Sequence, residues 1–284
     1  MAKLGLRLHV GQGTAHGPLT VFPVWTDAPT AAPRYLTSTG APVDVAERSG
    51  SPAVDQLVVT NRADRPVLLL AGELLEGGWQ TRALTTTTLL APDRPTVARV
   101  VCVEQGRWHG GQTHARRGRR APATVLRVLG REDAQQGVWE QVRGYEQVAG
   151  PSATDSLAER LNSIQLATQR LTQGLRPLAG QRGVLVGVAG RPTWLEIFDT
   201  RRSLVAHWPG LMQAATMDAL GRPAVRTPGA LARSFAERVE RTPMVLSGSS
   251  GLGVRLRGSD PRVRSDALHW DDRTIHLTAI ASEV

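Results

Sequence analysis

The sequence predicts an α+β protein with a β-rich antiparallel first half, in a sandwich or barrel-like sheet, packed with a helical middle and C-terminal strands. Short apolar or alternating runs, separated by Gly, Pro and other turn residues, fill the first part of the chain, as is typical of antiparallel sheets. Apolar residues at helical spacing follow, and alternating runs return at the end. Because strands and helices are grouped rather than strictly alternating, a doubly wound fold is disfavoured.

The β-rich part covers residues 1–108. Its expected strands are, in chain order, Leu4–Val10, Leu19–Trp25, Val43–Glu47, Gln56–Thr60, Val67–Ala71, Arg82–Leu90 and Val97–Glu104. Turn residues Asn61–Pro66 separate two of these runs, so we expect Gln56–Ala71 to be a β-hairpin. Residues 109–121 are rich in Gly and Arg without an apolar period, which indicates a loop.

The part from 120 to 284 is rich in helices and hairpins. Apolar residues recur at helical spacing from Val138 to Val148 and again from Leu157 to Leu175, which predicts a helix in each region. Ser156 and Glu159 have the spacing of a capping box at the start of the second helix.

The remaining elements follow in order. Gly183–Ala189 and Thr193–Phe198 are expected to form a second hairpin. A helix spans Leu204–Leu220, where Pro209 must start, kink or split it. A further helix opens with Thr227 as N-cap and Pro228 at its first position. The expected last strands are Gly253–Arg257, Val263–Trp270 and Thr274–Ala281.

We expect one domain over residues 1–284 in a cytoplasmic protein without membrane contact. No apolar run approaches the roughly 20 residues that cross a bilayer, and the N-terminus lacks the pattern of a secretory signal. Cys102 is the only cysteine, so no intrachain disulfide forms and a reducing compartment is expected. Homo-oligomerisation stays open.

The charge balance favours anionic partners. The net charge of +9 attracts nucleotides, phosphates and nucleic acid. Lys3 is the only lysine, however, and a bias toward Arg, Ala, Gly and Pro is also what a GC-rich genome produces without any function. The charge alone therefore does not select a partner.

The segment richest in polar groups runs from Gly72 to Arg82, directly after the apolar run Val67–Ala71. That strand would deliver Glu73 to the end of a sheet. The Gly77-Gly78 pair permits a tight turn or a close approach of the backbone to a ligand. The alternative is a glycine turn with surface charges.

Three side chains of this segment suit a binding or catalytic role. Glu73 could act as a general base or hold a ribose hydroxyl. Gln80 could orient a substrate, and Arg82 could clamp a phosphate or carboxylate through two parallel hydrogen bonds.

A second polar cluster follows the strand that ends near Cys102. Glu104 is a second candidate catalytic carboxylate, Arg107 could meet an anion, and Trp108 could stack on a base or ring. The competing interpretation is a structural Arg–Glu pair beside a core Trp.

Cys102 with His109 or His114 permits a nucleophile–base pair, although a lone cysteine is most often a small buried hydrophobe. The spacing of these residues matches no tetrahedral zinc pattern. We therefore predict no metal site and no cofactor.

Two further segments have weaker functional interpretations. Arg116–Arg120 lies in the densest positively charged stretch and could bind the phosphates of a nucleic acid. Runs of charged residues are more often solvent-exposed loops, however. Ser247–Gly253 is Gly-rich, yet a strand rather than a helix follows it. It therefore lacks the context of a dinucleotide-binding or Walker loop, and we expect a flexible hairpin loop.

The chain resembles the ARG and Rhodanese-Phosphatase-superfamily-associated protein domain, a family of unknown function. The residues that carry the resemblance are Phe22-Pro23-Val24-Trp25, Gly72-Glu73, Gly77-Gly78-Trp79-Gln80-Thr81-Arg82, Cys102 to Trp108, Ile197-Phe198-Asp199 and Ile275-His276-Leu277. Trp79 departs from the pattern, in which a small or basic residue precedes the Gln. The family name implies association with ADP-ribosylglycohydrolases and rhodanese-phosphatase proteins, and hence a role near ADP-ribose or other NAD-derived nucleotides.

Three hypotheses follow. The first is a domain that binds or processes a phosphorylated nucleotide such as ADP-ribose, with Arg82 and Arg107 on phosphates and Trp108 stacked on the base. The second is a non-enzymatic interaction or oligomerisation module, whose polar residues join two sheet ends. The third is non-specific nucleic-acid binding through Arg116–Arg120.

Overall fold

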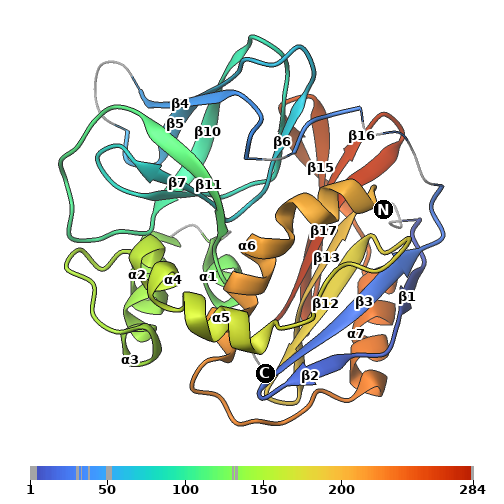
Figure 1. Cartoon of the computed structure of the whole chain (residues 1–284). Helices are drawn as coiled ribbons and strands as arrows, with labels where there is room; N and C mark the ends of the chain where they lie inside the picture. Colours follow the sequence, from blue (N-terminus) through green and yellow to red (C-terminus); the bar gives the residue numbers. More distant parts are fainter. Residues whose placement is uncertain are drawn as a thin grey trace. The chain divides into compact units, whose positions relative to one another are not determined.

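The computed structural model of the chain describes residues 5–29, 32, 34–37, 39–48, 53–129, 131 and 134–282. Backbone contacts divide the chain into two compact units. Unit 1 consists of Met1–Pro33, Gln169–Trp208 and Asp218–Val284, and unit 2 consists of Arg34–Thr168 and Pro209–Met217. Both contain antiparallel sheets and helices, which confirms the α+β class (Figure 1). A single domain over residues 1–284 stays a prediction.

Unit 1 is built on one antiparallel sheet. Its strands are β1 (Leu8–Val10), β2 (Thr14–His16), β3 (Leu19–Thr26), β12 (Gly183–Val188), β13 (Arg191–Phe198), β14 (Val245–Ser250), β15 (Gly253–Asp260), β16 (Val263–Trp270) and β17 (Arg273–Ala281). They pair in the order β1-β3-β12-β13-β17-β16-β15-β14, and β2 pairs with β3. Strands from both ends of the chain therefore meet in one sheet (Figure 1).

Helix α7 (Gly229–Arg241) covers one face of this sheet. Its buried residues Ala232, Phe235 and Val239 belong to one apolar core with Leu195 and Leu277 of the strands. Burial of the Phe, Val and Leu side chains of this core contributes about 1.5–3 kcal/mol each. The polar residues of α7 face away, as expected of an amphipathic helix on a sheet.

Unit 2 contains two further antiparallel sheets. Its strands are β4 (Val43–Glu47), β5 (Gln56–Asn61), β6 (Val67–Leu69), β7 (Glu73–Gly77), β8 (Arg82–Leu84), β9 (Thr88–Leu90), β10 (Pro95–Cys102) and β11 (His114–Arg120). Six of them pair in the order β11-β7-β8-β10-β5-β4, and β6 pairs with β9. Leu57, Val59, Leu75, Leu84 and Val100 belong to the apolar core of this unit.

The helices of the middle of the chain are α1 (Ala123–Val128), α2 (Ala134–Gly144), α3 (Glu146–Ala149), α4 (Leu157–Ser163), α5 (Gln165–Leu171) and α6 (Arg201–Ala219). The predicted helix from Leu157 to Leu175 is therefore two helices, because the backbone leaves helical geometry at Ile164. Ser156 caps α4 as predicted, by accepting a hydrogen bond from the Glu159 amide. Pro209 lies inside α6 without ending it. No helix in the described part of the chain combines the length and apolar character of a membrane span.

The predicted hairpin over Gln56–Ala71 is wrong. Strand β5 pairs with β4 and β10, whereas β6 pairs with β9. Asn61 explains the difference, because its side chain accepts a hydrogen bond from the Ala63 amide and donates to the carbonyl oxygens of Arg65 and Leu90. This side-chain-stabilised turn directs the chain away from β5.

The predicted loop over residues 109–121 is also wrong in its second half, which is strand β11 paired with β7. Arg116 pairs with Glu73, and Arg119 pairs with Glu76. Ion pairs along the ladder thus replace the apolar alternation by which a strand is recognised from sequence.

Three smaller differences concern turn residues. The predicted strand Arg82–Leu90 is two strands, β8 and β9. The predicted loop over Ser247–Gly253 contains the end of β14, which pairs with β15. Pro228 rather than Thr227 is the N-cap of α7, because the helix begins at Gly229 and Pro228 directly before it has extended backbone dihedrals.

Candidate functional site

Three strands of unit 2 place two arginines on one face of the sheet. Arg82 of β8 lies opposite Leu75 of β7, and Leu75 lies opposite Arg116 of β11. Residues directly opposite each other in an antiparallel ladder project from the same face. Arg82 and Arg116 therefore flank Leu75 in one row, and Cys102 of β10 extends this row on the other side of Arg82.

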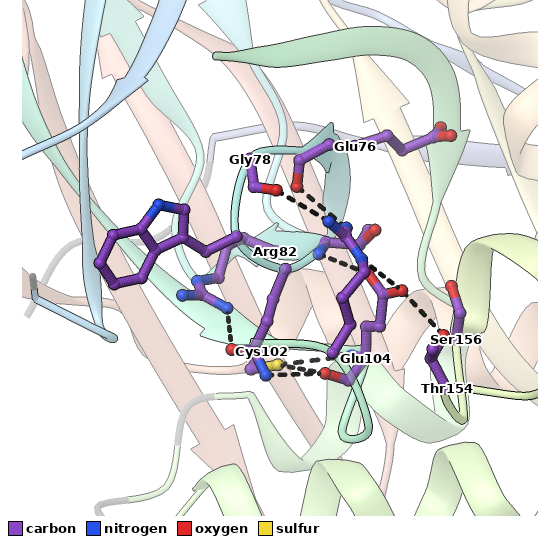
Figure 2. A network of polar contacts seen from close by, with 12 residues as sticks. Glu76, Gly78, Arg82, Cys102, Glu104, Thr154 and Ser156 are labelled. Atoms are coloured by element: carbon purple, nitrogen blue, oxygen red, sulfur yellow. Dashed lines mark hydrogen bonds and ion pairs between the residues drawn. The ribbon is translucent and has the colours of Figure 1, made fainter. Parts of the chain in front are cut away.

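Glu104 and Arg107 form a bidentate ion pair at the end of these strands (Figure 2). Arg107 Nε donates to Glu104 Oε1 at 2.9 Å, and Arg107 Nη2 donates to Glu104 Oε2 at 2.8 Å. The Thr81 amide and the Thr154 hydroxyl each add a hydrogen bond to this carboxylate, at 2.8 Å. The carboxylate is thereby fixed in one orientation.

The Gly77-Gly78 turn is the second partner of Arg107. Its guanidinium donates to the carbonyl oxygens of Gly78 at 2.8 Å and of Gly77 at 3.1 Å. Both glycines have positive φ, and a Cβ on Gly78 would lie 2.1 Å from Nε2 of the His114 ring. The turn therefore requires glycine both for its backbone conformation and for the close approach of His114.

Gln80 connects this ion pair to Arg82. Its amide nitrogen donates to the backbone oxygen of Glu104 at 3.0 Å, and its amide oxygen accepts a hydrogen bond from Arg82 Nη1. The predicted residues Gly77, Gly78, Gln80, Arg82, Glu104 and Arg107 are thus joined in one network.

Arg82 is the unusual member of the network. It is only 2% exposed, and its Nε is buried without a hydrogen-bond partner. Among the described residues, no carboxylate forms an ion pair with it, since its hydrogen bond goes to the neutral Gln80 amide. A buried charge without a counterion is costly by several kcal/mol.

Glu73 does not contact this network. It lies at the start of β7, where its carboxylate pairs with Arg116 Nε at 2.7 Å and accepts from the Leu70 amide at 3.3 Å. Nη1 and Nη2 of Arg116 are buried without hydrogen-bond partners. Arg82 and Arg116 therefore both present buried donor nitrogens without hydrogen-bond acceptors on this face.

Trp108 lies outside the network as well, with 55% of its surface exposed. An exposed indole next to Arg107 is free to stack on a planar ligand. Its predicted stacking role stays a prediction.

The protonation states at the site follow from burial and hydrogen bonding. Burial alone raises the pKa of Glu104, but hydrogen bonds from Arg107, Thr81 and Thr154 outweigh it and lower the pKa to about 2. A carboxylate with so low a pKa is a weak general base at neutral pH. The contacts of Glu104 therefore suit the orientation of neighbouring groups, and its catalytic assignment stays a prediction.

Two neighbours of Arg82 are uncharged at neutral pH. Burial raises the pKa of the Cys102 thiol, which disfavours the nucleophilic thiolate. Burial also lowers the pKa of His114, against the opposing effect of its hydrogen bond to Glu47 and with a smaller contribution from the charge of Arg82. Neither group therefore supplies a negative charge to Arg82.

Sequence reasoning missed Thr154, Arg116 and the His114–Glu47 pair, in which Nε2 of the ring lies 3.0 Å from the carboxylate. The sequence singles out Arg116 as part of the Arg-rich run and His114 as a candidate base beside Cys102, but it indicates neither of their carboxylate partners. In the described part of the chain, no three His, Cys, Asp or Glu side chains gather to hold a metal ion.

A protein-family model matches residues 7–280, and its description is ARG and Rhodanese-Phosphatase-superfamily-associated Protein domain. No curated protein matches the chain, and no solved structure matches it.

Proposed function

The chain belongs to the ARG and Rhodanese-Phosphatase-superfamily-associated Protein domain family, and from this premise we propose that unit 2 binds a phosphorylated nucleotide. The first part of the family name refers to ADP-ribosylglycohydrolases, so ADP-ribose or another NAD-derived nucleotide is the first ligand to test. The proposed function is nucleotide binding. Catalysis by Glu73 would be an additional property of the same site.

The observation that supports this proposal is the unpaired buried charge of Arg82. Its guanidinium lies on one face with Arg116, and Arg82 Nε, Arg116 Nη1 and Arg116 Nη2 all lack acceptors. A phosphate offers several acceptor oxygens and up to two negative charges, and arginine matches its geometry with parallel N–H donors. A bound phosphate would therefore satisfy these donors.

The other predicted residues have roles that fit this arrangement. Gln80 orients Arg82 through its amide oxygen, and the Glu104–Arg107 pair in turn fixes Gln80 through the Glu104 backbone. These are positioning residues. In the proposed complex Trp108 stacks on the nucleotide base, and Glu73 holds a ribose hydroxyl or acts as a base.

The experiment is a thermal-shift titration of the full chain with ADP-ribose, AMP and pyrophosphate. We expect ADP-ribose to raise the melting temperature, because a ligand that binds only the folded state stabilises it by mass action. Arg82→Gln should abolish the shift. The matched control is Arg99→Gln, an exposed arginine on β10, which should leave the shift unchanged.

The same experiment tests the interaction module, and a separate titration with a nucleic-acid duplex tests the third hypothesis. Absence of any shift at millimolar ligand contradicts nucleotide binding and favours an interaction module. A shift that Arg82→Gln leaves intact assigns the binding to other residues. Binding of any duplex with a steep salt dependence would instead favour nucleic acid, although Arg117 is the one arginine of β11 with a mostly exposed side chain, at 64%.

A further inference from the structure

Strand β14 is the last strand of the unit 1 sheet, and in the described part of the chain it pairs with β15 alone. The other side of its backbone is therefore an open edge. Charged residues, prolines and bulges are the common means by which edge strands avoid pairing with another chain. The sequence of β14, Val-Leu-Ser-Gly-Ser-Ser, contains no charged residue and no proline. A register shift between Leu246 and Ser249 divides the edge into two short segments.

Four large apolar side chains of the β14–β15 hairpin are exposed. Leu246 is 70% exposed and Val245 is 52% exposed, while Leu252 in the turn and Val254 on β15 are each 42% exposed. Single exposed apolar side chains are common on protein surfaces. A group of four on one hairpin is instead typical of a surface that another chain covers.

The strand register gives this edge two faces with different side chains. Leu246 lies opposite Leu256, so both project from one face of the sheet. Val254 projects from that face as well, because it is two residues from Leu256 along β15. Val245 lies opposite Arg257, and both therefore project from the other face. The first face is thus apolar at the edge of the sheet.

The second face is basic. Asp266 lies opposite Arg257 and shares this face with it. Arg255 and Arg264 are each two residues further along these strands, which places them on the same face. All three arginines form ion pairs with Asp266, at 3.4, 2.8 and 3.9 Å for Arg255, Arg257 and Arg264. These four side chains carry three positive charges and one negative charge, and the side chain of Arg257 is 41% exposed. Such a group attracts carboxylates.

A second copy of this chain suits the edge poorly. Two β14 strands that pair about a twofold axis perpendicular to the sheet keep each face of the sheet continuous across the interface. The basic groups of the two copies would then lie on one face and repel each other. An acidic segment is attracted by the same groups, so charge complementarity favours a partner that carries carboxylates.

We propose that β14 binds an extended acidic segment of a partner protein, which adds to the unit 1 sheet as a further strand. Strand addition supplies backbone hydrogen bonds to the open edge, and the side chains of the added strand alternate between the two faces. The bound segment therefore alternates apolar residues, which pack on Leu246 and Val254, with Asp or Glu residues on the face of Arg257. This surface includes no residue of the nucleotide site proposed for unit 2.

Fluorescence anisotropy of the full chain with labelled peptides of about six residues, the usual length of a strand, tests the proposal. One peptide alternates Val and Glu, and the second alternates Val and Lys. The third has the composition of the first, with Val and Glu in separate blocks. We expect the first peptide to bind at least about tenfold more tightly than either of the others, and to slow hydrogen exchange of the β14 backbone amides.

Each peptide tests one part of the proposal. Equal binding of the Val/Lys peptide would overturn the acidic partner, and equal binding of the block peptide would overturn strand addition. No binding of any peptide at millimolar concentration would overturn the site. A protein that is dimeric without peptide, and that Leu246→Gln makes monomeric in sedimentation, would assign the edge to a second copy and overturn the proposal as well.

Variants separate the two faces of the edge. Leu246→Gln should weaken the Val/Glu peptide about tenfold, because an apolar contact is lost. Its matched control is Leu166→Gln on α5, where the leucine is 69% exposed. Arg257→Gln should weaken the same peptide and reduce the salt dependence of its binding. Its control is Arg62→Gln, at an arginine whose side chain is 54% exposed and paired with Asp44. Both controls should leave binding unchanged, and unchanged binding in Leu246→Gln would place the peptide elsewhere.

Discussion

At the scale of single residues, the two carboxylates that the sequence offered as catalytic have different surroundings. Glu104 is held by Arg107, Thr81 and Thr154, whereas Glu73 is held by Arg116 and the Leu70 amide. The sequence indicated that polar residues end two neighbouring strands. Sequence patterns do not indicate which arginine forms an ion pair with each carboxylate, because Arg116 lies 43 positions from Glu73.

The low pKa of Glu104 makes its ion pair a source of stability that depends on pH. The pKa falls from 4.5 in the unfolded chain to about 2 in the folded protein. The contribution is therefore complete above pH 4.5 and is lost as the pH falls toward 2. Glu104→Gln should lower the free energy of unfolding at pH 7 by about 3 kcal/mol, since Arg107 keeps its charge without a partner.

Urea unfolding at pH 7, 4.5 and 3.5 measures this effect. The difference between Glu104→Gln and the native protein should shrink on acidification within this range. Glu237→Gln is the control, because Glu237 forms an exposed pair on α7 with 58% of its side chain accessible, and it should change stability little at any pH. A difference that is constant with pH would contradict the assigned pKa.

A substitution of Arg82 should change the free energy of unfolding in the opposite direction from Glu104→Gln. An unpaired buried charge destabilises the protein without ligand, so Arg82→Met, which keeps much of the side-chain volume, should raise the free energy of unfolding by about 1–4 kcal/mol. Urea unfolding without ligand measures it. If Arg82 only joined sheet ends as part of an interaction module, the same substitution would lower stability.

At the scale of elements, the alternation of apolar residues predicted the position of most strands. The strands that differ from the prediction are those whose pairing depends on polar side chains. Val43–Glu47 and Val263–Trp270 have the predicted bounds. Strand β11 has almost no apolar residue, and its arginines meet their acids on β7 only after the chain has folded. The pairing of β5 likewise depends on the Asn61 side chain, whose partner Leu90 lies 29 positions away.

The turn between β7 and β8 carries the strictest sequence requirement of the site. Gly78→Ala would place a Cβ 2.1 Å from the buried His114 ring at a φ of +55°. We expect a loss of about 1–3 kcal/mol from overpacking, with further strain from the positive φ. Gly111→Ala is the control, because an added Cβ there meets no atom within 4 Å. Thermal unfolding of both variants compares them, and equal melting temperatures would contradict this requirement.

At the scale of the whole molecule, part of the positive charge of the chain is carried by buried arginines. The net charge is +9, yet Arg82, Arg120, Arg160 and Arg182 are buried at 5% exposure or less. Composition therefore overstates the charge available to a nucleic acid. The sequence predicted the fold class and the group of polar residues, but not burial, which depends on the pairing of distant strands.

The strand order of unit 1 has a consequence for synthesis on the ribosome. Strand β3 pairs with β1 and β2 nearby, but its central neighbour β12 begins at Gly183. The nascent β3 therefore leaves the exit tunnel with an unpaired edge, and unpaired edges favour aggregation. Residues 34–168 of unit 2 are translated in that interval. We expect newly made chains truncated before Gly183 to engage chaperones that bind exposed β edges.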